Sequence, residues 1–234
     1  MKYYFICTLL LISTLSPRLL SQETPVKANY DYDDLMYGPL YQFQYFGQNQ
    51  HPFFIYDKPI KSDLVYKGNS YKNVHIFYDV YQQELVLFQE IDPKLPRYIC
   101  LNPSYIKSWS LKNNGIEYVF RHLLAYRDKL PEKPILFSMH HDGQLKFFSS
   151  VIKEYEKDPY GSNSEFEIQE KYYLIKEDEL FPVRNRRTLL KALDDEREKM
   201  KEYIRSNKLR LRLSRIDHII TLIKYYEELK TPVN

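Results

Sequence analysis

The stretch Asp63–Gln89, DLVYKGNSYKNVHIFYDVYQQELVLFQ, decides the fold class of this chain. It contains short segments rich in aromatic and aliphatic residues, the longest being Tyr71–Tyr78, separated by polar turn residues. Apolar residues recur in it with a period of two, which indicates β-strands with one buried face. Because the turns are short, the stretch predicts three antiparallel strands that follow one another as a meander.

The same pattern extends from Tyr41 to about Val183. Two further hairpins are predicted around Asn113-Asn114-Gly115 and His141-Asp142-Gly143, because Asn or Asp before Gly adopts the positive φ of a tight turn. A last strand pair, 171–175 with 180–183, closes over residues 176–179. The predicted fold is α+β: a mainly antiparallel β-sheet domain over 41–183, as a meander, a sandwich or a partly open barrel, followed by two to three C-terminal helices.

The segment 184–234 changes to the period of a helix. A helix is predicted from Ser214 to near Lys230, with Ser214 and Asp217 as a capping-box-like pair. A second helix is expected over 194–205 and a short helical turn over 188–193. The last helix carries an apolar stripe formed by Ile216, Ile219, Ile220, Ile223 and Tyr226. β-Branched residues are mediocre helix formers, so we expect this stripe to be buried, with Ile220 as its test position.

The N-terminus has the pattern of an export signal. Met1-Lys2 is followed by an apolar run over residues 3–15 that is too short to span a bilayer, and we predict cleavage between Ser21 and Gln22. Residues 1–21 are then the signal peptide and 22–40 a linker, and an uncleaved anchor is the alternative. The mature protein is expected outside the cytoplasm, periplasmic, outer-membrane associated or extracellular, with no membrane span.

The numbers of cysteine and glycine residues limit the kinds of functional site that this chain can form. The sequence has 23 Tyr and 13 Phe but only 6 Gly and 2 Cys, and it lacks the glycine motifs that cradle phosphates. After cleavage Cys100 is the single cysteine left, which we expect to be buried in a short strand, with pairing to another chain as the alternative. No G-x-S-x-G motif marks a nucleophilic serine.

The charge divides along the same boundary as the fold. Residues 22–182 carry 18 basic and 23 acidic side chains, whereas residues 183–234 carry 14 and 8. We expect the basic helices to dock on an acidic sheet or to be solvated, and a site for an anionic partner is the alternative. The basic cluster lacks interleaved aromatics, so nucleic acid is not expected as a partner. Its members are Arg184, Arg186, Arg187, Arg205, Lys208, Arg210, Arg212 and Arg215.

Two stretches contain residue types that bind metals. His140, His141 and Asp142 are adjacent, but neighbouring strand residues point to opposite faces, so a plain hairpin is the favoured interpretation. Asn29–Asp34 alternates oxygen ligands, yet it lacks the glycine and distal glutamate of an EF-hand loop and is expected to be solvated linker. We therefore predict neither a metal nor another cofactor.

Several of these segments together resemble a known group of sequences. The signal peptide, the segment 64–79, the hairpin around His141-Asp142-Gly143, the strand at Lys171–Leu174 and the closing helix 219–229 are similar to those of β-rich exported proteins of Gram-negative bacteria. The function of that group is unknown. The resemblance covers most of the mature chain and implies an exported β-rich protein, but it implies no catalytic residue.

The expected function is that of an exported binding or structural protein of the cell envelope, without catalysis. Its expected partner is another envelope protein or a glycan. A carbohydrate-binding module is the first alternative, and it requires several tyrosines or Trp109 coplanar in one exposed groove. An envelope hydrolase is the second, and it requires a deep pocket that gathers histidines or carboxylates such as Glu84 and Glu90.

Overall fold

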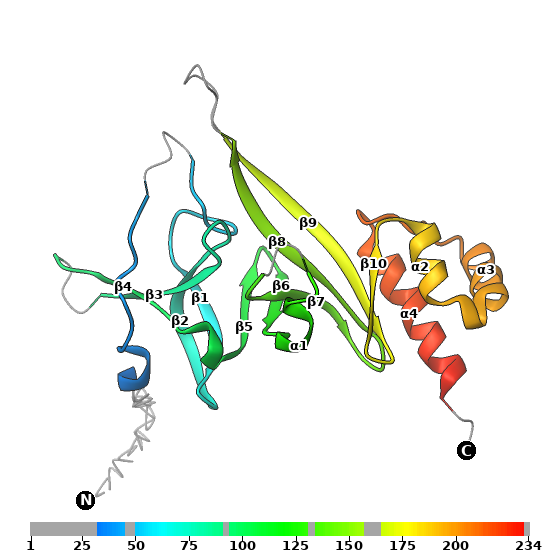
Figure 1. Ribbon diagram of the computed structural model, residues 1–234, viewed down its shortest axis with the longest axis horizontal. Coiled ribbons are helices and arrows are strands. Elements are labelled where there is room, and N and C mark those ends of the chain that lie inside the picture. Colours follow the sequence, from blue (N-terminus) through cyan, green and yellow to red (C-terminus); the bar gives the residue numbers. More distant parts are fainter. Residues whose placement is uncertain (1–31, 45–49, 91–93, 131–133, 157–164, 232–234) are drawn as a thin grey trace, which may run out of the picture. The chain divides into compact units, whose positions relative to one another are not determined.

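The computed structural model describes residues 32–44, 50–90, 94–130, 134–156 and 165–231 (Figure 1). Ten strands form one antiparallel sheet in the order β10-β9-β8-β7-β6-β5-β1-β2-β3-β4. Their bounds are β1 Ile60–Tyr66, β2 Asn69–Asp79, β3 Glu84–Gln89, β4 Arg97–Cys100, β5 Ile106–Asn113, β6 Ile116–Arg121, β7 Phe137–Asp142, β8 Lys146–Glu156, β9 Glu165–Lys176 and β10 Glu179–Val183.

This sheet confirms the predicted α+β class and the antiparallel pairing. The predicted meander over 63–89 is β1–β3, in which β2 lies between β1 and β3. The sheet is open, because β10 and β4 form its two edges, so it is neither a sandwich nor a closed barrel. β1 lies beside β5, and this pairing joins the strands β1–β4 to the strands β5–β10 in a single sheet.

Turn chemistry explains the tightest connections. Asn114 (φ 49°) and Gly115 (φ 78°) both have positive φ, as the sequence predicts for the β5–β6 hairpin. The prediction of positive φ for Gly143, in the β7–β8 connection, is wrong, because β7 continues through His141 and Asp142. A Cβ atom at Gly143 would lie 2.6 Å from His141 Nε2 and 2.5 Å from Glu227 Oε1, so a larger residue there would displace the ends of these two side chains.

The three longer helices follow the sheet in sequence, as predicted: α2 Arg186–Ala192, α3 Arg197–Ser206 and α4 Ile216–Lys230. Shorter pieces are the helix α1 Leu124–Arg127 before β7 and the 3₁₀ turns η1 Tyr32–Leu35 before β1, η2 Pro103–Tyr105 before β5 and η3 Asp194–Glu196 before α3. A capping box of Asn185 and Thr188 starts α2. The capping-box-like pair predicted for Ser214 and Asp217 is not formed, because α4 begins after Arg215 without a side-chain cap. No helix in the described ranges is long and apolar enough to cross a membrane.

The C-terminal helix α4 is part of a hydrophobic core, as predicted, but its buried face is shifted. Ile219, Leu222, Ile223 and Tyr226 are buried in a cluster that includes Phe147 and Leu174 of the sheet and residues of α2 and α3. Ile216 and Ile220 are only partly buried. Ile220 is therefore the wrong test position, and Leu222 is a buried residue that the predicted stripe omits.

The described end of the predicted linker packs against the sheet. Leu35, in η1, is 0% exposed and belongs to the cluster that also contains Trp109 and Phe120. Leu40 forms an isolated β-bridge with Ile99 of β4. The predicted signal peptide with Ser21 and Gln22, and residues 29–31 of the acidic stretch, lie outside the described residues.

Candidate functional site

A row of aromatic side chains lies on one face of β2, β3 and β4. Alternate residues of these strands, Phe77, Val86, Phe88 and Tyr98, point away from the core that contains Trp109. Tyr41, Phe43 and Phe53 from the segment before β1 cover part of this face. We call the row His75, Phe88, Tyr98 and Phe43 the aromatic face.

The rings of the aromatic face touch one another in sequence along the row. Ring centroids are 6.3 Å apart for His75 and Phe88, 5.4 Å for Phe88 and Tyr98, and 4.6 Å for Tyr98 and Phe43. Phe43 is 55% exposed and His75 is also exposed, whereas Phe88 and Tyr98 are half-buried. The row thus has accessible ends and a packed middle.

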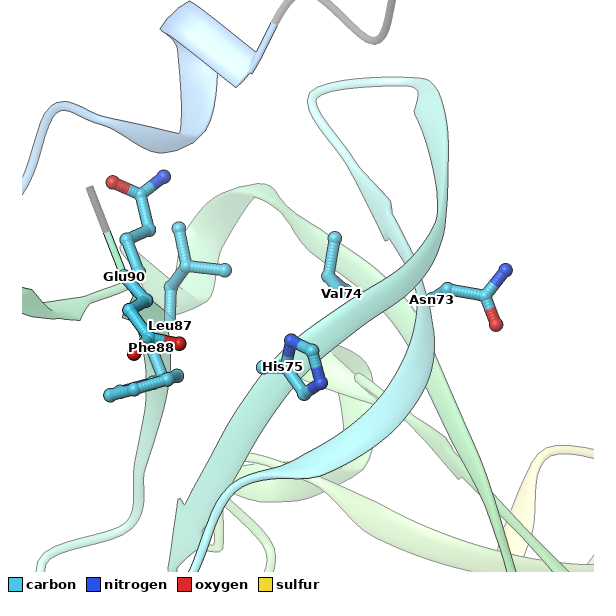
Figure 2. A pocket seen from close by; sticks show the side chains of 7 residues that line it. Asn73, Val74, His75, Leu87, Phe88 and Glu90 are labelled. Atoms are coloured by element: carbon cyan, nitrogen blue, oxygen red, sulfur yellow. The ribbon is translucent and has the colours of Figure 1, made fainter. Parts of the chain in front are cut away.

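A hollow of about 240 Å³ lies at the His75 end of the aromatic face. It forms where β3 ends at Gln89 while β2 extends from Val74 back to Asn69 beside β1 alone. Figure 2 shows its lining, with the side chains of Asn73, Val74 and His75 from β2 on one side and those of Leu87, Phe88 and Glu90 on the other. Among the described residues, none forms a hydrogen bond with the buried Oε1 atom of Gln89, which also lines the hollow. A ligand with an N–H or O–H group would satisfy this acceptor.

Buried polar contacts hold the segments beneath and beside the aromatic face. Asp79, which is 0% exposed, accepts hydrogen bonds from the Tyr41 hydroxyl (2.5 Å) and from the backbone N–H groups of Tyr81 and Gln82. Burial and the Asp79 carboxylate raise the pKa of Tyr41, so its hydroxyl stays a donor. Lys153 Nζ donates to the carbonyl oxygens of His51 and Phe53 (2.8 and 2.6 Å).

Cys100 lies on the same side of β4 as Tyr98 and is half-buried. Its Sγ atom is 3.4 Å from Glu84 Oε2, to which the thiol donates a hydrogen bond. Burial, followed by the neighbouring Glu84 carboxylate, raises the pKa of Cys100 to about 12. The group is therefore a protonated thiol near neutral pH, not a reactive thiolate.

Ring geometry on the aromatic face suits a protein partner better than a sugar. A sugar platform needs flat, accessible rings, but Phe43 and Tyr98 meet at 89° and Phe88 and Tyr98 at 52°. Trp109, the other platform candidate, is 1% exposed and stacks on Phe120 in the core. Half-exposed aromatic rings with packed neighbours are typical of protein–protein contact sites.

The three metal candidates bind separate partners. A register shift between Met139 and His141 makes His140 a bulge, so both histidines face the helical cluster, and the predicted alternation of faces is wrong here. His140 stacks on Tyr172, and His141 Nε2 lies 2.9 Å from Glu227 Oε2 of α4. Asp142 pairs with Arg121 and Lys146 (2.8 and 2.7 Å). Within the described ranges, no three His, Cys, Asp or Glu residues are grouped as a metal site.

Sequence analysis missed a polar chain that ends at His140. Ser149, which is 0% exposed, donates to Glu170 Oε1 (2.7 Å) and lies 2.9 Å from His140 Nε2. Both contacts can be hydrogen bonds at once only if His140 donates to the serine oxygen. His140 therefore does not act as a base toward Ser149, which is the activation that a serine hydrolase requires. No motif in the sequence signals this chain, because its members come from β7, β8 and β9.

The burial of His140 predicts a pH-dependent stability. Burial lowers the pKa of His140 below its usual 6.5, with Glu170 opposing the shift. The unfolded chain then binds a proton below about pH 6.5 that the folded chain does not, so stability falls as the pH decreases through this value. We expect His140→Gln, which keeps a donor for Ser149, to lose less free energy of unfolding than the wild type between pH 7.5 and 5.5. Urea unfolding at both pH values measures this, and equal losses would contradict the assignment, since His51 and His122 titrate in both proteins.

In the ion pairs between the sheet and the helical segment, the basic groups lie on the sheet and the acidic groups on the helical segment, which is the reverse of the prediction. Lys176 of β9 pairs with Asp195 of η3 (2.6 Å), and His141 contacts Glu227, so the acids lie on the helical side. The idea that basic helices dock on an acidic sheet is therefore wrong. The basic side chains after β10 are instead exposed: Arg184, Arg186, Arg187, Arg205, Lys208, Arg210, Arg212 and Arg215.

Comparisons with protein-family models, with curated proteins and with solved structures found no match to this chain. The fold agrees with the structural part of the resemblance described above, because the chain is β-rich and antiparallel and ends in helices. Export remains a prediction from the N-terminal sequence, and a bacterial envelope remains a prediction from the resemblance.

Proposed function

We propose that this chain is an exported, non-catalytic binding protein of the cell envelope, and that it binds another envelope protein through the aromatic face. The observation that carries the proposal is the row His75, Phe88, Tyr98 and Phe43, which is exposed at both ends and packed in the middle. The apolar run and small residue of the predicted signal peptide support the export part.

The surroundings of the row have the composition expected of a contact site. Aromatic side chains contribute large apolar areas at little cost in conformational entropy, and they often dominate the binding energy of an interface. Asn73 and Glu90 provide polar groups at the rim of the hollow, and the Gln89 Oε1 atom provides an acceptor that no described residue uses. A partner that covers Phe88 and Phe43 and inserts one side chain into the hollow would contact the aromatic rings, the polar rim and the Gln89 acceptor.

The test is capture of partners from an envelope extract with the purified mature protein. We expect Phe43→Ala and His75→Ala to weaken capture at least about fivefold each, because truncation of an aromatic side chain that contributes to an interface costs more than about 1 kcal/mol. Both side chains are exposed, so these changes should leave the unfolding midpoint almost unchanged. Tyr105→Ala is the matched control, because this tyrosine is 49% exposed and lies in η2, outside the aromatic face.

Bound proteins are identified and quantified by mass spectrometry, with each variant measured beside the wild type. Equal capture by wild type, Phe43→Ala and His75→Ala would contradict the assignment of the aromatic face. Equal loss with Tyr105→Ala would show nonspecific adhesion. N-terminal sequencing of the protein from its native host should give Gln22, and an intact Met1 in the membrane fraction would contradict the export part.

A further inference from the structure

The first half of β9 extends beyond its neighbour at the edge of the sheet. β9 spans Glu165–Lys176, whereas β10 spans only Glu179–Val183 and pairs with Tyr172–Lys176 (Figure 1). β8 pairs with β9 over its whole length, from Glu165 to Ile175. Over residues 165–171, the side of β9 that faces away from β8 therefore has no described strand beside it.

The backbone groups of Ile168 and Glu170 point to this side. Lys153 is opposite Ile168 in the β8–β9 ladder, and its N–H donates to Val80, away from β9. Such a pair is not hydrogen-bonded within the ladder, so the N–H and C=O of Ile168 point away from β8. Pro182, which is opposite Tyr173 and has no N–H, agrees with this alternation.

No described residue bonds to these groups of Ile168 and Glu170, whereas the N–H of Phe166 is bound by Gln50 Oε1 (3.2 Å). The Ile168 side chain is 58% exposed, and charged residues flank it. A strand edge with unused backbone groups and an exposed apolar residue is a site at which another strand can add.

In one antiparallel register around Ile168, each strand end pairs opposite charges and no like charges lie directly opposite each other, although each strand carries three glutamates and one lysine. If Ile168 faces Ile168 of a second copy, then Glu165 of each copy faces Lys171 of the other. Opposite charges that face each other across paired strands stabilise the pairing, and like charges destabilise it. Arg184, which follows the Val183–Tyr172 pair, adds positive charge at the end where Glu165 of the second copy would lie.

We propose that two copies of this chain associate by antiparallel pairing of their β9 strands about a two-fold axis at Ile168. The two Ile168 residues exchange their backbone hydrogen bonds, and the N–H of Glu170 donates to the C=O of Phe166 in the other copy, whereas the N–H of Phe166 keeps Gln50 Oε1 as its acceptor. The paired isoleucine side chains cover each other. The resulting sheet continues from one copy into the other. The proposal depends on the edge of β9 alone and is independent of the aromatic face, which lies on β2–β4.

The first test is a disulfide between two copies of Ile168→Cys. In a hydrogen-bonded antiparallel pair the Cα atoms are about 5.5 Å apart, which is within the range that a disulfide spans. With a mild oxidant we expect a covalent dimer on a non-reducing gel. Ile116→Cys is the matched control, because Ile116 is 56% exposed on β6, and it should form no covalent dimer. The wild type should form no covalent dimer either, since its Cys100 is half-buried and the denaturing gel separates a non-covalent dimer.

The second test reverses the charges and measures the dimer by sedimentation velocity. Glu165→Lys and Lys171→Glu should each weaken dimerisation about five- to tenfold, because each places like charges opposite each other at both ends of the interface. The double variant restores opposite charges and should dimerise about as well as the wild type. A wild type that is monomeric at millimolar concentration, a dimer insensitive to these charges, or equal cross-linking through residue 116 would overturn the proposal.

Discussion

Ile223→Ala is expected to lower the free energy of unfolding by about 2–5 kcal/mol, which is a large part of the roughly 5–15 kcal/mol by which a domain is stable. Ile223 is 0% exposed and lies in the cluster that joins α4 to the sheet and to α2 and α3. Truncation removes apolar contacts and leaves a cavity that the neighbours fill only in part. Urea unfolding of the wild type and the variant measures the difference.

Ile220→Ala is the matched control, because it makes the same chemical change on the same helix at a residue outside the buried face. Ile220 is partly buried, so its truncation should cost clearly less than that of Ile223. Equal losses at the two positions would mean that α4 does not pack in the orientation described. A loss of under about 0.5 kcal/mol at Ile223 would show that the helix is not part of the core at all.

Asp79→Ala is expected to cost about 3–5 kcal/mol, because it removes the acceptor from a group of buried donors. The Asp79 carboxylate accepts from the Tyr41 hydroxyl, the N–H groups of Tyr81 and Gln82, and the Gln82 side chain. Without it, these donors remain in a site that water does not reach freely. The negative charge that favours the protonated form of buried Lys153 is lost as well.

Asp63→Ala is the control for this change. Asp63 also accepts a side-chain and a backbone hydrogen bond, from Lys72 Nζ (2.7 Å) and Asn73 N (3.3 Å), but its carboxylate is 43% exposed. Water replaces these contacts, so the loss should be under about 1 kcal/mol. Similar losses for the two variants in urea unfolding would show that Asp79 is not the buried acceptor of this network.

Much of the fold could be predicted from local sequence. The alternation in Asp63–Gln89 and the residues Asn114-Gly115 indicate strands and a tight turn because side-chain direction and φ depend on the nearest residues along the chain. The change of period after Val183 predicts the helices for the same reason. The buried face of α4 was predicted less well, because the residues that cover it come from the sheet and from α2 and α3.

The candidate sites depend on pairing between distant segments. Tyr98 contacts Phe43 because β4 pairs with β3 and the segment before β1 lies across these strands. The same segment brings the Tyr41 hydroxyl to Asp79. The bulge at His140 turns both histidines toward the helices, and a single-residue shift of this kind changes which face a side chain occupies.

The sequence by itself determined the elements: antiparallel strands, the tight turn at Asn114-Gly115 and the C-terminal helices. Only the tertiary structure decided that the sheet stays open, that β9 outreaches β10, and that His75, Phe88, Tyr98 and Phe43 form one row. Strand and turn preferences act over a few residues, whereas register and sheet order result from the packing of side chains far apart in the chain.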